Sequence, residues 1–108
     1  VRMFKADDPF WTANHVTDGP CPYRTKDGSL IMIWSNNIIK SGYSVGIARS
    51  ATGEIDGEWT HDMFPLYVKG IYHELDGGHG MIFEDSDGTM YLSIPELKTA
   101  SNPSEFTV

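Results

Sequence analysis

At 108 residues, of which 40% are hydrophobic and 12% aromatic, the chain has the composition of one small folded domain and not of a disordered segment. Its net charge of −7 argues against nucleic acid as a partner, because phosphate binding needs a basic surface. No apolar run approaches the roughly 20 residues that span a bilayer, so no membrane partner is expected. The single cysteine permits no internal disulfide. The compartment therefore stays open: secreted or periplasmic if a signal peptide was removed ahead of this numbering, cytoplasmic otherwise.

The first 16 residues have no sustained periodicity and are predicted to be the end of a preceding structural unit. Phe10 and Trp11 need an apolar surface to cover, and this segment does not supply one. The carboxylates of Asp7 and Asp8 stand before a proline and are interpreted as part of a solvated turn.

Asp18 stands at the start of the most ordered stretch of the chain. It is followed by Gly19 and Pro20 and then by two strand-like runs, 21–24 and 30–35, which an Asp-Gly turn connects into a hairpin. Its carboxylate is therefore expected at the mouth of a strand, on a rigid backbone.

The second strand of this hairpin is apolar on both faces. Leu30, Met32 and Trp34 share one face and Ile31 and Ile33 share the other, which predicts an inner strand of a packed sheet. Trp34 is accordingly interpreted first as a core residue, and second as a ring that stacks on a sugar.

A third strand is predicted over residues 43–50, with large and small side chains on opposite faces. The small residues are Ser44, Gly46, Ala48 and Ser50. A face of small residues would let a neighbouring sheet approach closely. Arg49 ends the row of large residues, and is interpreted as one half of a structural salt bridge or, alternatively, as a substrate-binding side chain.

The next part of the chain is predicted to be mostly loop. A polar loop covers residues 52–57, and a short outer strand covers residues 64–67, where Pro65 is expected at an edge. His61 and His73 have no partner at metal-ligand spacing, so both are interpreted as surface residues.

The hairpin occurs a second time. Residues 23–33 align without gaps with residues 83–93, an offset of 60, and both copies have an aromatic residue, an Asp-Gly turn and a small hydroxyl residue that opens the next strand. Extended backwards, the alignment places His79, which three glycines surround, close to the position equivalent to Asp18. A functional His79 and a structural turn residue are both open interpretations.

A repeated β unit of this length indicates a β-propeller, in which four-stranded antiparallel blades surround a channel; a chance similarity is the alternative. The predicted fold is therefore all-β. The predicted units are residues 1–16 as a lead-in, 17–76 as a first blade, and 77–108 as an incomplete second blade with an extended tail.

Several motifs, in this order and over about the last four fifths of the chain, resemble glycoside hydrolase family 43. They are Val16-Thr17-Asp18-Gly19-Pro20, Tyr23-Arg24, Met32-Ile33-Trp34-Ser35, the run from Gly42 to Ser50, Gly57-Glu58-Trp59, and the run from Gly77 to Phe83. The resemblance implies blades of a five-bladed propeller that acts on arabinose- and xylose-containing polysaccharides.

The resemblance also assigns roles to two residues. Asp18 falls at the family's general acid, a position that is Glu in the better-known members. His79 falls at a histidine near the channel axis that helps to bind a central calcium ion or a water molecule. Enzymes of this family invert configuration, with an acid and a base about 6.5–9.5 Å apart. The acid needs burial or a neighbouring negative charge to hold its proton near neutral pH.

The chain lacks two carboxylates that the family uses for catalysis. The family's general base and its pKa-tuning aspartate belong to earlier blades, and neither Asp7 nor Asp8 matches the motif of the base. The isolated chain is therefore expected to be inactive. The expected partners are an oligo- or polysaccharide and either further copies of the chain or the missing blades.

Two other interpretations remain open at this stage. The first is a non-catalytic carbohydrate-binding or interaction module, in which Trp11, Trp34 or Trp59 stacks on a sugar. The second is a structural β domain without a ligand.

Overall fold

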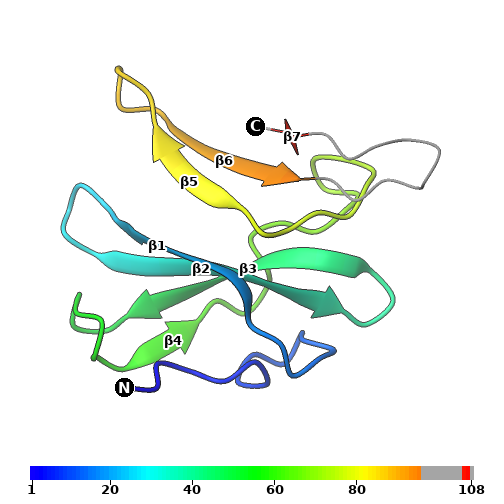
Figure 1. The fold of residues 1–108 in the computed structure, drawn as a ribbon, viewed down its shortest axis with the longest axis horizontal. Helices are drawn as coiled ribbons and strands as arrows, with labels where there is room; N and C mark the ends of the chain where they lie inside the picture. The colour runs from blue at the N-terminus through cyan, green and yellow to red at the C-terminus, as the bar shows by residue number, and fades with distance from the viewer. Residues whose placement is uncertain (96–105, 108) are drawn as a thin grey trace.

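The structure, a computed structural model, describes residues 1–95 and 106–107 and forms two antiparallel sheets there (Figure 1). The first sheet contains, in spatial order, β1 (Asp18–Arg24), β2 (Leu30–Ile38), β3 (Gly42–Ser50) and β4 (Trp59–His61). The second contains β5 (Met81–Glu84), β6 (Met90–Pro95) and β7 (Phe106–Thr107). The predicted all-β class and the four-stranded antiparallel unit are confirmed. Within the described residues there is no helix of the length and apolarity that a membrane crossing requires.

The two predicted hairpins have the same register. In the first, Tyr23 pairs with Ile31, and in the second, Phe83 pairs with Tyr91. Each residue of the second pair lies 60 positions after its counterpart in the first. The repeat is therefore a structural repeat as well as a sequence repeat.

The turns of the two hairpins are also built alike. Gly28 and Gly88 both have a positive φ, +87° and +79°, which only glycine adopts without strain. The amide of Gly28 donates to the carbonyl of Thr25 and that of Gly88 to the carbonyl of Asp85, each over 3.0 Å. Local turn chemistry thus specifies both hairpins.

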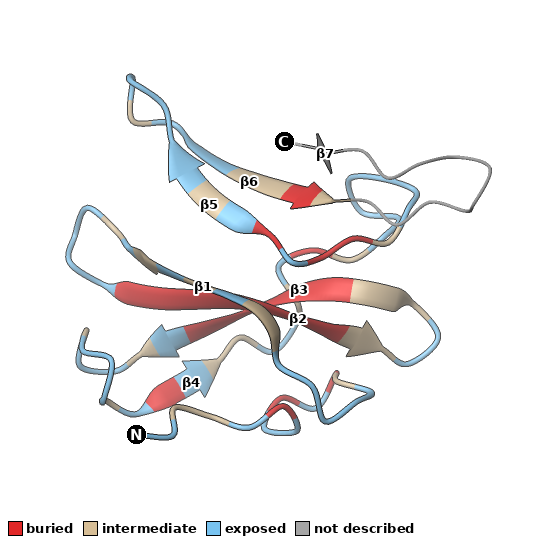
Figure 2. Cartoon of the chain, viewed as in Figure 1, coloured by how far each residue is buried: buried red, intermediate tan, exposed pale blue. Residues whose placement is uncertain are grey.

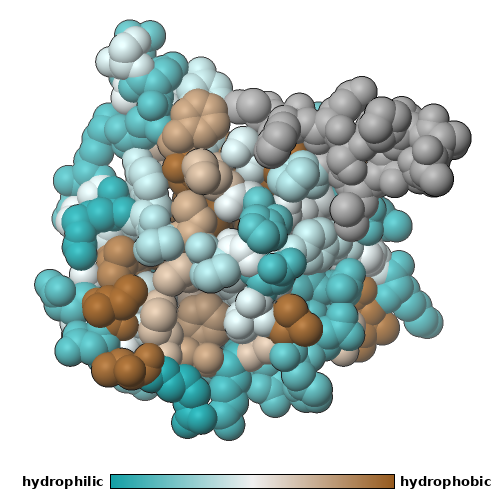
Figure 3. Space-filling model, viewed as in Figure 1, coloured by the Kyte–Doolittle hydropathy of each residue, from teal (hydrophilic) through white to brown (hydrophobic). Residues whose placement is uncertain are grey.

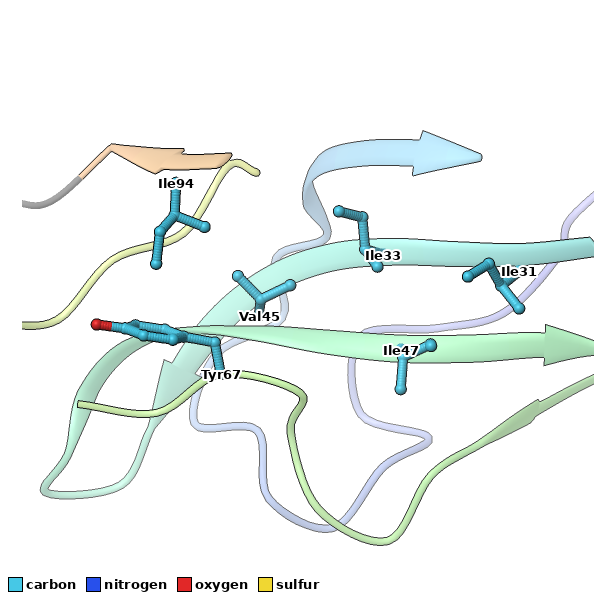
Figure 4. Packing of buried hydrophobic residues seen from close by; sticks show 6 residues of the cluster. All are labelled: Ile31, Ile33, Val45, Ile47, Tyr67 and Ile94. Atoms are coloured by element: carbon cyan, nitrogen blue, oxygen red, sulfur yellow. The ribbon is translucent and has the colours of Figure 1, made fainter. Parts of the chain in front are cut away.

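The main core lies between the two sheets, on the Ile31 and Ile33 face of β2. Val45 and Ile47 of β3 join these two residues, and Ile94 of β6 closes the cluster from the second sheet (Figure 4). Figure 2 shows the buried residues concentrated along β2 and β3. This confirms β2 as an inner strand.

The other face of the first sheet packs against the N-terminal segment. Trp34, which is 0% exposed, contacts the rings of Phe4 and Trp11, with centroids 5.3 and 5.5 Å away. The Trp11 ring also fills the space next to Gly46 that a side chain would occupy. The small face of β3 therefore receives an indole and not a neighbouring sheet, which corrects the prediction.

Two predictions for the loop region are wrong. The outer strand is β4, and residues 64–67 form only an isolated bridge between Tyr67 and Val45, because Pro65 has no N–H to donate to a ladder. His61 is not a surface residue: both of its ring nitrogens are buried, and its ring stands edge-on to Phe4 at 4.7 Å.

The predicted C-terminal tail is partly a strand. In β7, Phe106 pairs with Pro95 and Thr107 with Ile94, so the described end of the chain extends the second sheet. The rest of the predicted tail, residues 96–105 and 108, lies outside the described residues. Elsewhere, hydrophobic side chains reach the surface in several places on the face that Figure 3 shows.

Candidate functional site

Asp18 and His79 come together where the second sheet begins. The Oδ1 of Asp18 lies 3.6 Å from the Nδ1 of His79, and the side chains are 46% and 65% exposed. Asp18 is the first residue of β1, and His79 lies two residues before β5. The structure thus brings together the two polar residues that the internal repeat placed in related positions.

The backbone around His79 is held in an unusual conformation. His79 has a φ of +55°, which is uncommon for a residue other than glycine. Its amide donates to the hydroxyl of Ser35, a fully buried residue of β2, over 2.8 Å. Gly78 lies against this hydroxyl and the ring of Tyr43, so closely that a Cβ there would be 2.9 and 2.7 Å from them. This contact docks the second sheet onto the first.

The carboxylate of Asp18 accepts hydrogen bonds at both oxygens. The Tyr43 hydroxyl donates to Oδ2, and the amide of Gly19 donates to Oδ1 over 2.9 Å. The bond from Tyr43 is the largest cause that lowers the pKa of Asp18, and the partial burial of the carboxylate opposes it. With the groups described here, Asp18 is therefore ionised at neutral pH.

An open cavity of about 460 Å³ lies beside this pair. Its lining includes Asp18, His79 and the adjoining backbone on both sides, from Thr17 to Pro22 and from His79 to Met81. The volume is within the range of small-molecule sites. A small molecule could thus reach the carboxylate from solvent.

The structure does not bring Trp34 or Arg49 into this site. Trp34 is 0% exposed, so it occupies the core position of its first interpretation and offers no ring face to a sugar among the described residues. Arg49 lies four residues further along β3 than the partner of Ser35, about 13 Å away at the rise of a strand. It pairs with Asp62 through Nε and Oδ1 at 2.8 Å, as its structural interpretation expected.

The other two tryptophans are buried as well. Trp11 is 7% exposed and Trp59 is 8% exposed, so neither offers a ring face to a sugar. Stacking on these rings, the basis of the carbohydrate-binding alternative, therefore has no support in the structure.

The residues around His79 do not fit a calcium site. Calcium takes six to eight oxygen ligands, and an imidazole nitrogen is not among those that it prefers. Nowhere in residues 1–95 and 106–107 do three or more His, Cys, Asp or Glu side chains gather into a metal-binding group.

Sequence reasoning missed two residues of the site, Tyr43 and Ser35. Sequence patterns place Tyr43 and Ser35 in strands and in motif runs, but they assign neither residue a role in the site. Asp18 pairs with Ser35, and Tyr43 lies two residues before Val45, the partner of Ser35. This register includes an irregularity between Asp18 and Cys21, and the local pattern does not fix the size of the shift.

Comparison with solved structures finds arabinose-active hydrolases. An endo-arabinase from Bacteroides thetaiotaomicron VPI-5482 matches 97% of this chain, with a TM-score of 0.76 and 33% sequence identity. An alpha-L-arabinofuranosidase from Lactobacillus brevis matches 95% of it, with a TM-score of 0.71 and 18% identity, which speaks for the fold alone.

The chain spans only 38% and 33% of the lengths of these two proteins. No family model matches the chain. No curated protein matches it either. Both neighbours are propeller enzymes, and each is matched over a minor part of its length. The chain therefore has the fold of about two blades of a β-propeller, and its neighbours are enzymes of the glycoside hydrolase family 43 type that its motifs resemble.

Proposed function

We propose that this chain is the part of an arabinan-acting, inverting glycoside hydrolase that carries the general acid, Asp18. The observation that carries the proposal is the 33% identity to an endo-arabinase over 97% of the chain, together with a carboxylate at an open cavity beside the junction of the two sheets. Both neighbours are named for enzymes of arabinose-containing substrates, which favours arabinose over xylose.

The proposed reaction is a single displacement. The carboxylic acid of Asp18 gives its proton to the glycosidic oxygen as the bond from that oxygen to the anomeric carbon breaks. A water molecule adds its hydroxide to the opposite side of the same carbon and loses its other proton to a carboxylate base. The products are two sugars, an ionised Asp18 and a protonated base, which exchange a proton through solvent.

The base and the residue that tunes the acid are proposed to come from outside this chain. Tyr43 and the Gly19 amide both stabilise the ionised form of Asp18, and its side chain is 46% exposed. A general acid needs the opposite environment near neutral pH. Further blades would supply it by burying Asp18 and by placing a negative charge near it, which raises a carboxyl pKa.

The test compares the natural protein that contains this chain with the 108-residue chain alone. Both are given linear arabinan and 2,4-dinitrophenyl α-L-arabinofuranoside, and light scattering gives their masses. We expect the natural protein to cleave both substrates and NMR to show a first product of inverted configuration. We expect the isolated monomer to cleave neither.

Asp18→Asn is the decisive variant. It should lower kcat on arabinan by about 10²–10⁴-fold, but should affect the dinitrophenyl glycoside far less, because that leaving group needs no proton. Asp62→Asn is the matched control, since it removes a carboxylate next to Arg49, away from the cavity. Equal loss on both substrates, or none, would contradict the role of Asp18 as acid. Turnover by an oligomer of the isolated chain would mean that copies complete the site.

A further inference from the structure

Tyr43 is the only side chain of the first sheet, among the described residues, that donates a side-chain hydrogen bond to Asp18. Contacts other than that bond also hold Tyr43 in place. Its amide donates to the Oδ2 of Asp76 over 3.1 Å, and its carbonyl accepts the amide of Gly77 over 3.2 Å. The ring lies against Gly78. Tyr43 is thus anchored on both sides of its backbone and along its ring.

The hydroxyl of this anchored ring makes the two oxygens of Asp18 unequal. Oδ2 accepts from Tyr43 and is turned toward β3, whereas Oδ1 lies on the His79 side, 3.6 Å from Nδ1. Oδ1 also accepts the Gly19 amide, which occupies one of its two lone pairs. Each oxygen keeps a second lone pair that can carry a proton, so the two oxygens differ in the side that they face and not in the number of hydrogen bonds that they accept.

The hydroxyl stays a donor throughout the working pH range. Burial, followed by the bond to Asp18, raises the pKa of Tyr43 to about 12. The ring therefore does not ionise while Asp18 exchanges its proton. With the proton on Oδ1, Oδ2 stays an acceptor, so the Tyr43 hydroxyl donates to it in both states of the carboxyl group.

We propose that Tyr43 is a positioning residue, which holds Oδ2 of Asp18 against β3 so that Oδ1, on the His79 side, is the oxygen that presents the acid proton to substrate. This role rests on the proposed function of Asp18 as general acid. It does not make Tyr43 a catalytic residue, because the hydroxyl touches the carboxyl group and not the reacting atoms.

Tyr43→Phe tests this role, because it removes the hydroxyl and keeps the ring that packs on Gly78. Tyr67→Phe is the matched control: that ring is buried, and its hydroxyl donates to the carbonyl of Leu75 over 2.7 Å, away from Asp18. In the natural protein, Tyr43→Phe should lower kcat on arabinan at least tenfold with KM changed less than twofold. The loss on the dinitrophenyl glycoside should be at least threefold smaller. Tyr67→Phe should show neither effect.

A second readout does not depend on hydrolysis. Carbon-13 NMR of the aspartate carboxyl groups in the 108-residue chain follows the titration of Asp18, assigned with Asp18→Asn. Tyr43→Phe should move this titration to higher pH, and Tyr67→Phe should leave it in place. The two readouts can disagree. If the wild-type protein cleaves no arabinan but Tyr43→Phe shifts the titration of Asp18, then the proposed function is wrong and the contact between Tyr43 and Asp18 is confirmed.

Two results would overturn the positioning role. One is an unchanged titration of Asp18 in Tyr43→Phe. The other is a loss of kcat that is the same on both substrates, or that Tyr67→Phe reproduces, because both would follow from general loosening of the fold and not from a misdirected proton.

Discussion

Gly19 and His79 interlock at the junction of the two sheets. A Cβ placed on Gly19 would stand 2.7 Å from the Cα of His79 and 2.8 Å from its Cγ. Both residues have a positive φ, +50° and +55°. The second sheet can therefore approach Asp18 only because Gly19, the residue after it, has no side chain.

Gly19→Ala should destabilise the protein by about 1–3 kcal/mol, because the new methyl group meets backbone and the φ of +50° is unfavourable for alanine. Urea unfolding measures the loss. Gly28→Ala is the control: its φ is +87°, but a Cβ there would have no described atom within 4 Å apart from Gly28 and its two chain neighbours, so only the backbone cost remains. The His79 amide resonance should shift in Gly19→Ala only. Equal behaviour of the two variants would mean that the interlock contributes nothing.

His79→Gly should separate a functional His79 from a structural one. Glycine adopts a φ of +55° without strain, so the free energy of unfolding should stay within about 1 kcal/mol of the wild-type value. If His79 serves the site, hydrolysis by the natural protein falls nonetheless. A stability loss of several kcal/mol with normal turnover per folded molecule would show that His79 is structural.

Trp34→Ala should be the most destabilising change in the first sheet, at about 3–5 kcal/mol, because it empties a site with no exposed surface. Trp34→Phe should cost less, since it retains a ring beside Phe4 and Trp11 and removes an indole N–H that has no hydrogen-bond partner among residues 1–95 and 106–107. Thermal unfolding compares the two. If both variants lowered the stability only slightly and by similar amounts, the buried position of the Trp34 ring would be contradicted.

His61 should make stability fall as the pH is lowered. Burial lowers the pKa of its imidazole below the ordinary value of about 6.5, although the negative charges of Asp8 and Asp62 oppose this shift. Between about pH 7 and pH 5, the unfolded chain then binds more protons at this residue than the folded protein does. The contribution of neutral His61 is complete above the unfolded pKa, and is lost as the pH falls toward the folded pKa.

His61→Phe should therefore flatten this part of the stability profile, because phenylalanine keeps the contact with Phe4 and cannot be protonated. Urea unfolding at pH 7, 6 and 5 gives the profile. His15→Gln, which changes an exposed histidine, should retain the wild-type slope. A slope that is the same in all three proteins would rule out His61 as its source.

Arg49→Gln should change stability by less than about 1 kcal/mol and leave hydrolysis unaffected. The pair with Asp62 is largely exposed, at 53% and 40% for the two side chains, and exposed ion pairs contribute little. Denaturant unfolding and arabinan assays on the natural protein check both parts. A large rise in KM for arabinan would restore the substrate-binding role that the structure does not support.

Much of the fold could be predicted from local patterns. The two hairpins follow from Asp-Gly turns in which Gly28 and Gly88 take a positive φ, and from the apolar character of β2 on both faces. The position of Asp18 at the start of β1 follows from the same local signals. Such features depend on a few neighbouring residues, so the sequence alone determined them.

The composition of the site was decided only by tertiary structure. Asp18 meets Tyr43 and His79 across 25 and 61 positions of sequence, through a strand register with a bulge and through two close glycine contacts. The same applies to Trp34, whose buried surroundings come from the N-terminal segment. Long-range packing selects among the faces and registers that local propensity leaves open, and it therefore determines what a side chain such as Asp18 contacts.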